Sequence, residues 1–330
     1  MARRKLYNGG TRSEPQGDPA PPAQKSPPST AFPVTRLEWC FLNFEGDLRS
    51  GWKFAAYVVL LIVFWVVGGI AVGSIFELTG NLVSPFVNFA LNMIVNLTAA
   101  AGATVFLART VDRVPASSFV GFTSWAANFG KGIGIGALLL TILLAAFAAF
   151  GDLAVAANFP QFYSHLMQAI MTIVLLSAGA AFEELTFRGY AMQSLAVGIG
   201  RWPAAAVTAV LFGVLHLRNP HASALGIINT VLAGLLLSGA YYKVRSLWLP
   251  FGIHVAWNVG LGMVAGFPVS GLSLDTLWIA SSNGSSTLTG GDYGPEGGLF
   301  CTMAFAAGFA TIHLVRPGEA ANAPRLKKKI

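Results

Sequence analysis

Long apolar stretches, separated by short polar segments, make up most of this chain from Lys53 onward. A helix needs about 20 apolar residues to cross the hydrocarbon core of a membrane. Eight stretches reach or approach that length, at residues 53–76, 84–108, 131–150, 166–188, 203–217, 222–243, 247–267 and 298–315. The pattern predicts an all-α membrane protein, built as a bundle of about eight transmembrane helices.

The composition agrees with a chain that lies in lipid. Of its 330 residues, 54% are hydrophobic and 11% are charged, whereas soluble domains carry about 25% charged residues. The net charge of +7 does not indicate nucleic acid, because no face combines aromatic and basic residues. The cysteines Cys40 and Cys301 form neither a disulfide framework nor a C-x-x-C site. The expected partner is therefore the lipid bilayer, and no oligomeric state is indicated.

The positions of Lys and Arg predict the orientation, because basic residues concentrate in cytoplasmic segments. If the N-terminus is cytoplasmic, all of the 21 Lys and Arg residues except Arg218 fall on the cytoplasmic side or, for Arg188, in a buried motif. The long loop at 268–297 contains Glu296 and other acidic residues but neither Lys nor Arg, as expected of an outer loop. Both termini are therefore predicted to be cytoplasmic.

The chain divides into four parts. Residues 1–35 are rich in Pro and lack apolar periodicity, which predicts a disordered cytoplasmic tail. Residues 36–52 are expected to form a linker or a short helix along the membrane interface. Residues 53–318 form the polytopic domain, and 319–330 form a basic cytoplasmic tail.

Three pairs of glycines have the GxxxG spacing that lets membrane helices pack closely. The pairs are Gly69 with Gly73, Gly130 with Gly134, and Gly132 with Gly136. A nucleotide-binding loop would need a strand–turn–helix context, which the helical pattern does not offer. We expect close helix packing at these pairs.

Polar and ionisable side chains interrupt the apolar pattern between residues 183 and 258. Charged groups at membrane depth cost at least about 2.5–3.5 kcal/mol each on insertion scales, so they rarely persist without a function. The cluster consists of Glu183, Glu184, Arg188, His216, His254 and Asn258. With a helical rise of about 1.5 Å per residue, its members lie at compatible depths, in the cytoplasmic half of the bilayer or near its centre. Carboxylates and imidazoles that meet there can carry out hydrolysis.

The first motif, A-F-E-E-L-T-F-R-G, assigns different roles to two adjacent glutamates. Glu184 and Arg188 are four residues apart and share a helix face, so we expect them to form a charge pair. Glu183 points about 100° away from Glu184 around the helix and is free to act as general base or acid. The alternative is a buried ion-pair cluster that fixes the helix register.

The other two motifs each place a histidine four residues from a second side chain. Phe212 precedes His216, and His254 precedes Asn258, which can orient His254 or donate to an oxyanion. A lone histidine in an apolar helix is more often a packing residue than a ligand. Three neighbouring stretches each contribute a polar pair, however, which favours one shared site.

In this order, the motifs E-E-x-x-x-R, F-x-x-x-H and H-x-x-x-N resemble those of the CPBP family of intramembrane proteases. This family includes the CAAX prenyl endopeptidases of the Rce type and bacterial relatives linked to bacteriocin self-immunity. The resemblance covers residues 181–258 and implies an intramembrane endopeptidase whose site opens toward the cytoplasm. It implies that Glu183 activates water, with Glu184 and Arg188 supporting it.

Two mechanisms fit the resemblance. In one, Glu183, His216 and His254 hold a Zn²⁺ ion, which would activate the attacking water. In the other, a Glu183–His216 pair deprotonates water while His254 and Asn258 donate to the oxyanion. The residues alone do not decide between a metalloprotease and a glutamate protease.

A short chain rich in Ala and Gly is typical of a bacterial protein, so the expected location is a bacterial inner membrane. The expected substrate is then a hydrophobic or membrane-anchored peptide. A catalytically silent membrane scaffold or immunity partner of the same fold is the alternative. An ion-coupled transporter would predict inverted repeats, and the sequence shows no repeat.

Overall fold

A computed structural model of the chain describes residues 36–43, 45–78, 84–150, 153–157, 162–274, 276 and 278–317. The two predicted tails, 1–35 and 319–330, lie outside the described residues. The chain divides into two units, Met1–Cys40 and Phe41–Ile330. The described residues of the first unit belong to a short helix, α1 (Arg36–Phe41). Whether residues 36–52 lie along a membrane interface stays a prediction.

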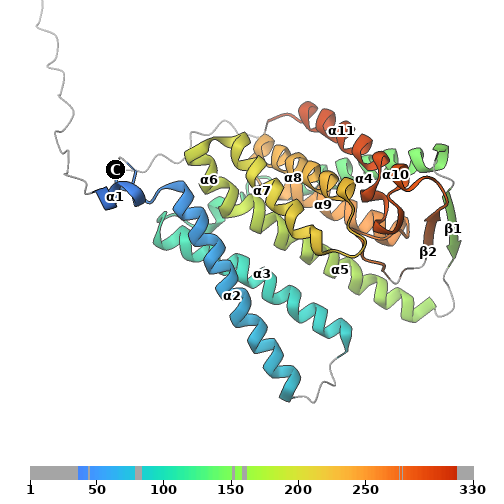
Figure 1. Ribbon diagram of the computed structural model, residues 1–330, viewed down its shortest axis with the longest axis horizontal. Helices are drawn as coiled ribbons and strands as arrows, with labels where there is room; N and C mark the ends of the chain where they lie inside the picture. The colour runs from blue at the N-terminus through green and yellow to red at the C-terminus, as the bar shows by residue number, and fades with distance from the viewer. Residues whose placement is uncertain are drawn as a thin grey trace, which may run out of the picture. The chain divides into compact units, whose positions relative to one another are not determined.

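The second unit is built mainly from helices (Figure 1). They are α2 (Ser50–Leu78), α3 (Pro85–Thr110), α4 (Trp125–Phe150), α5 (Phe162–Thr186), α6 (Met192–Ile199), α7 (Arg201–Leu215), α8 (Ala224–Val244), α9 (Trp248–Val259), α10 (Ser286–Thr289) and α11 (Leu299–Leu314). Short 3₁₀ or π turns occur at Ala116–Phe119, Phe187–Ala191, His216–Arg218, Gly260–Val264, Gly291–Tyr293 and Pro295–Gly297. Each predicted apolar stretch coincides with one of the long or medium-length helices.

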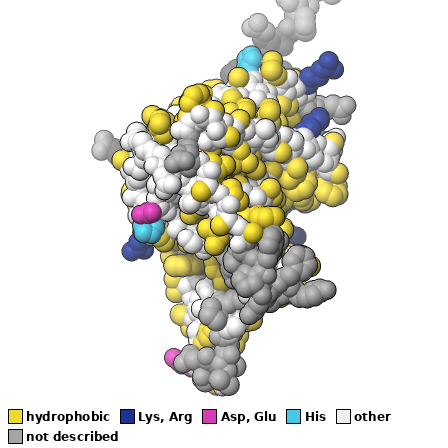
Figure 2. Space-filling view, turned by 90° about the vertical axis from the view of Figure 1, so that its right-hand side faces the viewer, with side chains coloured by type: hydrophobic (Ala, Val, Ile, Leu, Met, Phe, Trp, Pro, Cys, Tyr) yellow, Lys and Arg dark blue, Asp and Glu magenta, His cyan; other side chains and the backbone are white. Residues whose placement is uncertain are grey.

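Membrane-spanning character is clearest in five helical segments of the described chain. These are Ser50–Leu78, Val87–Thr110, Trp125–Phe150, Leu166–Ile199 and Ala224–Val244, which are long and apolar enough to cross a bilayer. Figure 2 shows hydrophobic side chains spread over the visible face, as expected of a surface that meets lipid. These are the features of an all-α membrane protein. Because α7, α9 and α11 are shorter, the count of eight spans and the cytoplasmic termini stay predictions.

The fourth apolar stretch continues beyond its predicted end at residue 188. After α5 the chain passes through a π-helical turn at Phe187–Ala191, kinks at Gly189 and enters α6. Tyr190 in this turn donates a hydrogen bond of 2.6 Å to Oδ2 of Asp112. Oδ1 of Asp112 lies 2.5 Å from Nζ of Lys53 on α2. These contacts fix the π-helical turn against the ends of α2 and α3.

A two-stranded antiparallel sheet, β1 (Leu153–Ala157) with β2 (Trp278–Ser282), was not predicted. Leu153 pairs with Ser282 and Ala157 with Trp278. The sequence L-A-V-A-A lacks the alternation of apolar and polar residues that identifies a strand. The sheet joins the segment between α4 and α5 to the long segment before α11.

The GxxxG prediction is confirmed for one glycine pair. A Cβ atom on Gly136 of α4 would lie 2.6 Å from the carbonyl oxygen of Ile253 on α9. A Cβ atom on Gly132 would collide with the carbonyl oxygen of Leu249, also on α9. Gly252 of α9 approaches the α4 backbone in the same way. Side chains larger than hydrogen cannot fit between these backbones, so the glycines set the position of α9.

The same prediction is wrong for the other two pairs. A Cβ atom on Gly69, Gly73, Gly130 or Gly134 would meet no atom of the described residues within 4 Å. Gly130 and Gly134 are each two residues, or about 200° around the helix, from the glycines that contact α9. Spacing alone places two glycines on one face but does not say whether another helix covers it.

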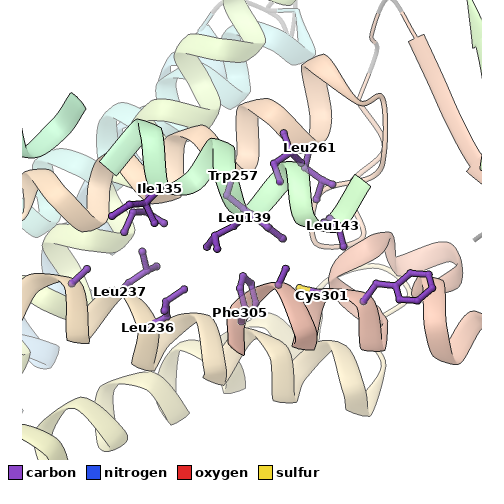
Figure 3. Close-up of a cluster of buried hydrophobic side chains, with 14 of the residues drawn as sticks. Ile135, Leu139, Leu143, Leu236, Leu237, Trp257, Leu261, Cys301 and Phe305 are labelled. Atoms are coloured by element: carbon purple, nitrogen blue, oxygen red, sulfur yellow. The ribbon is translucent and has the colours of Figure 1, made fainter. Parts of the chain in front are cut away.

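The main core lies between α4, α8, α9 and α11, as Figure 3 shows. Its labelled side chains, which point toward one another, are Ile135, Leu139, Leu143, Leu236, Leu237, Trp257, Leu261, Cys301 and Phe305. Burial of aliphatic and aromatic groups contributes roughly 1.5–3 kcal/mol per side chain. This core holds α9, which carries His254 and Asn258, against its neighbours.

Candidate active site

The three motifs meet at one cavity of about 410 Å³. Glu183, His216, His254 and Asn258 line it, together with Phe212. They come from α5, from the end of α7 and from α9. The structure therefore brings together side chains as far apart in the sequence as Glu183 and Asn258.

Glu184 and Arg188 form the predicted ion pair behind the wall of the cavity. Nη1 of Arg188 lies 3.0 Å from Oε1 of Glu184, and Nη2 donates to the carbonyl oxygen of Gly234 at 3.1 Å. Arg188 is 0% exposed and Glu184 is 1% exposed. Removing one partner of so buried a pair would leave an uncompensated charge, which is strongly destabilising.

His254 lies between the two adjacent glutamates. Its Nδ1 atom is 2.9 Å from Oε1 of Glu184, and its Nε2 atom is 3.5 Å from Oε2 of Glu183. Because an ionised carboxylate can only accept, Nδ1 carries the proton and Nε2 faces Glu183. Helical spacing predicted Arg188 as the partner of Glu184 but says nothing of a second partner 70 positions away.

The two glutamates differ in accessibility. The Glu183 side chain is 27% exposed, whereas that of Glu184 is 2% exposed. A substrate or a water molecule in the cavity can therefore reach Glu183 but not Glu184. The arrangement suits Glu183 for proton transfer and Glu184 for holding the His254 ring.

Phe212 packs against residues from each of the other motifs. Its ring centre lies 4.9 Å from Cζ of Arg188 and 6.4 Å from the centre of the His254 ring. The His216 ring packs edge-on against it at 4.6 Å. The aromatic position of the second motif thus joins the buried charge pair to the cavity.

His216 and Asn258 have polar atoms available at the cavity. Nδ1 of His216 lies 2.7 Å from the carbonyl oxygen of Phe212, which fixes Nδ1 as a donor and leaves Nε2 unprotonated in the neutral ring. Within the described ranges, the Asn258 side chain makes no hydrogen bond to His254, so Glu184 rather than Asn258 orients that imidazole. The amide of Asn258 is free to contact a substrate.

The predicted Zn²⁺ ligands do not converge in this arrangement. In the part of the chain that the structure describes, no three His, Cys, Asp or Glu side chains are placed to hold a metal ion. Glu183 approaches His254, and no ion pair joins Glu183 to His216 among the described residues. The donor set of Glu183, His216 and His254 therefore does not fit zinc in this conformation.

One cavity residue, Glu296, was not predicted from the sequence. It was expected in an outer loop, but it lines the same cavity as Glu183 and His254. Its Oε1 accepts a hydrogen bond of 2.9 Å from Nε1 of Trp257, and Oε2 accepts bonds from the backbone and hydroxyl of Ser270. In the sequence, Glu296 is one of two carboxylates in a glycine-rich run, and nothing there separates it from Asp292.

Comparison with known proteins gives one family. Residues 165–260 match the family model of the type II CAAX prenyl endopeptidases, Rce1-like. The matched segment contains every residue of the three motifs and ends before Ser270 and Glu296. No curated protein and no solved structure matches the chain.

Proposed function

We propose that this chain, in which residues 165–260 belong to the Rce1-like family of CAAX prenyl endopeptidases, hydrolyses a peptide bond of a hydrophobic or membrane-anchored peptide. The proposal rests on the His254 imidazole held between Glu184 and Glu183 beside the cavity. The family match supports a site facing the cytoplasm, and the Ala- and Gly-rich composition supports a bacterial host.

The first step is the attack of water on the scissile carbonyl carbon. Glu183 accepts a proton from the water as the new C–O bond forms and the carbonyl π electrons move to oxygen. His254 faces Glu183 through Nε2 and shares this proton. General base catalysis of this kind contributes about 10²–10⁴-fold to a rate.

Glu184 and Arg188 act as positioning residues. The carboxylate of Glu184 holds Nδ1 of His254, and Arg188 in turn holds Glu184. Neither residue lines the cavity, so neither touches the substrate. Their role is to keep Nε2 of His254 pointed at Glu183.

The second step breaks the C–N bond. The amide of Asn258 donates a hydrogen bond to the oxyanion of the tetrahedral intermediate. His216 presents Nε2 as an acceptor that orients the water before attack. As the intermediate collapses, the proton on Glu183 passes to the departing nitrogen, which leaves a carboxylic acid and an amine. The proposed steps use only side chains of this chain, in keeping with the lack of a three-donor group among the described residues.

Cleavage of a library of hydrophobic peptides by the detergent-purified protein tests the proposal. We expect the wild type to cleave a subset of peptides and Glu183→Gln to lose about 10²–10⁴-fold in kcat. Glu77→Gln is the matched control, because Glu77 is an exposed carboxylate on α2 outside the cavity. No cleavage by the wild type would contradict a protease and favour a silent scaffold, whereas equal cleavage by Glu183→Gln would contradict the role of Glu183 as the base.

A further inference from the structure

Polar side chains that line the cavity outside the motifs gather on one side. Apart from Thr186, they come from α8, from the residues just before it and from the 265–298 segment. They include Asn219, Asn229, Thr230, Ser270 and Glu296. The residues of α2 and α3 that line the cavity, Leu61, Phe89 and Met93, are apolar. The cavity therefore offers one ligand an apolar wall from α2 and α3 and, opposite in character, a wall where these polar side chains stand among apolar ones of α8 and the 265–298 segment, here called the polar wall.

Glu296 is the charged member of the polar wall, and its carboxylate is rigidly held. Trp257 donates to Oε1 at 2.9 Å, and the Ser270 hydroxyl donates to Oε2 at 2.9 Å. The Glu296 backbone is held as well, because Nδ2 of Asn229 donates to its carbonyl oxygen at 2.8 Å. Thr302 in turn donates to Oδ1 of Asn229 at 2.7 Å.

The Glu296 carboxylate retains acceptor capacity and negative charge. An ionised carboxylate has about four acceptor sites, and Trp257 and Ser270 occupy three of them. Within the described ranges, no Lys, Arg or His side chain pairs with Glu296. Glu296 is partly buried and lines the cavity without a counter-ion among the described residues, so a cationic ligand group in the cavity would be favoured.

We propose that Glu296 is a specificity-determining residue that binds an ammonium group of the substrate. The ammonium is that of a Lys side chain or of a free N-terminus, and both share the same chemistry. A substrate that fits is a hydrophobic peptide whose apolar side chains contact the apolar wall while its ammonium contacts Glu296. This inference rests on the proposed peptidase function of the same cavity.

A purely structural role for Glu296 makes a different prediction. Glu296→Gln removes the charge but keeps an amide oxygen that can accept from Trp257. Ser270→Ala is the matched control, because it removes one hydrogen bond to Glu296 and keeps the charge. If Glu296 only fastens the 265–298 segment, both variants should alter peptide selection alike.

Three peptides separate the two sources of the ammonium group. They share one cleavable hydrophobic sequence and carry an acetylated N-terminus with Lys, an acetylated N-terminus with acetyl-lysine, or a free N-terminus with acetyl-lysine. We expect wild type to favour one charged peptide over the neutral one by about tenfold in kcat/KM, through KM, at moderate salt. Glu296→Gln should lose this preference, and Ser270→Ala should keep it.

Binding without turnover distinguishes failure of this inference from failure of the protease proposal. The same peptides, fluorescently labelled, are titrated into Glu183→Gln and into Glu183→Gln/Glu296→Gln, and the Kd is measured by anisotropy. A Kd ratio of about ten that the second substitution abolishes supports the ammonium site even if no cleavage occurs. Equal Kd values for charged and neutral peptides in Glu183→Gln would overturn it, as would equal loss of preference in Ser270→Ala.

Discussion

Cζ of Arg188 lies 4.9 Å from the centre of the Phe212 ring. A guanidinium over an aromatic face gains about 0.5–2 kcal/mol, most when both are withdrawn from water. Arg188 is completely buried and Phe212 nearly so. Phe212 of the second motif therefore stabilises the charge of Arg188 in the first motif. This contact explains why an aromatic residue belongs to a set of motifs that is otherwise polar.

Phe212 variants test this contact. Phe212→Leu keeps an apolar group but removes the ring, so we expect a loss of about 1–2 kcal/mol in unfolding free energy. Phe212→Ala also leaves a cavity and should cost about 3–5 kcal/mol. Denaturant unfolding in detergent measures both, with Phe309→Leu on the exposed side of α11 as control. An unchanged midpoint in Phe212→Leu would contradict the stabilising contact.

The buried pair of Arg188 and Glu184 predicts strongly non-additive substitutions. Arg188→Met leaves the Glu184 carboxylate without its cation and should destabilise the protein by about 3–5 kcal/mol. The double variant Arg188→Met/Glu184→Gln removes both charges and should recover part of that loss. A double-mutant cycle on unfolding free energies gives the coupling. Additive effects would show that the two side chains do not stabilise each other.

Two glycines of α4 predict opposite effects of the same substitution. Gly136→Ala brings a methyl group 2.6 Å from the carbonyl oxygen of Ile253, so it should destabilise by about 1–3 kcal/mol. Gly134→Ala meets no atom of the described residues within 4 Å and should be neutral or stabilise by up to about 1 kcal/mol through helix propensity. Thermal unfolding in detergent compares them. Equal shifts in Tm would show that α4 and α9 are not in close backbone contact.

Chelation tests the proposed route without zinc. Because Glu183, His216 and His254 do not converge, we expect dialysis against EDTA to leave peptide hydrolysis within about twofold of the untreated enzyme. Metal content is measured on the same samples by mass spectrometry. Activity lost on dialysis and restored by Zn²⁺ would instead show that the three side chains rearrange around a metal.

Local spacing predicted the contacts that a helix makes within itself. The Glu184–Arg188 pair follows from positions four apart, and the apolar stretches follow from hydropathy. His254 as the second partner of Glu184 could not be predicted, because nothing in either helix specifies which faces meet. The position of α9 is set by close approach at Gly132, Gly136 and Gly252, which only the packed structure reveals.

The segments between helices were the least predictable. Residues 153–157 form a strand because they pair with 278–282, and neither segment carries a strand pattern of its own. Glu296 was treated as one of several acidic residues in a polar loop, since its hydrogen bonds to Trp257 and Ser270 depend on how that loop folds back. Long-range pairing of this kind leaves little mark on one sequence.

Helix α9 carries both His254 and, one turn later, Trp257, whose indole donates a hydrogen bond to Glu296. The same helix therefore positions the imidazole and the Glu296 carboxylate. A tilt of α9 would displace the His254 imidazole and the Glu296 carboxylate together. Under the proposed function, substitutions in the 265–298 segment would change peptide preference while every residue of the three motifs stays the same. Proteins that share these motifs are therefore expected to differ in substrate preference before they differ in catalytic mechanism.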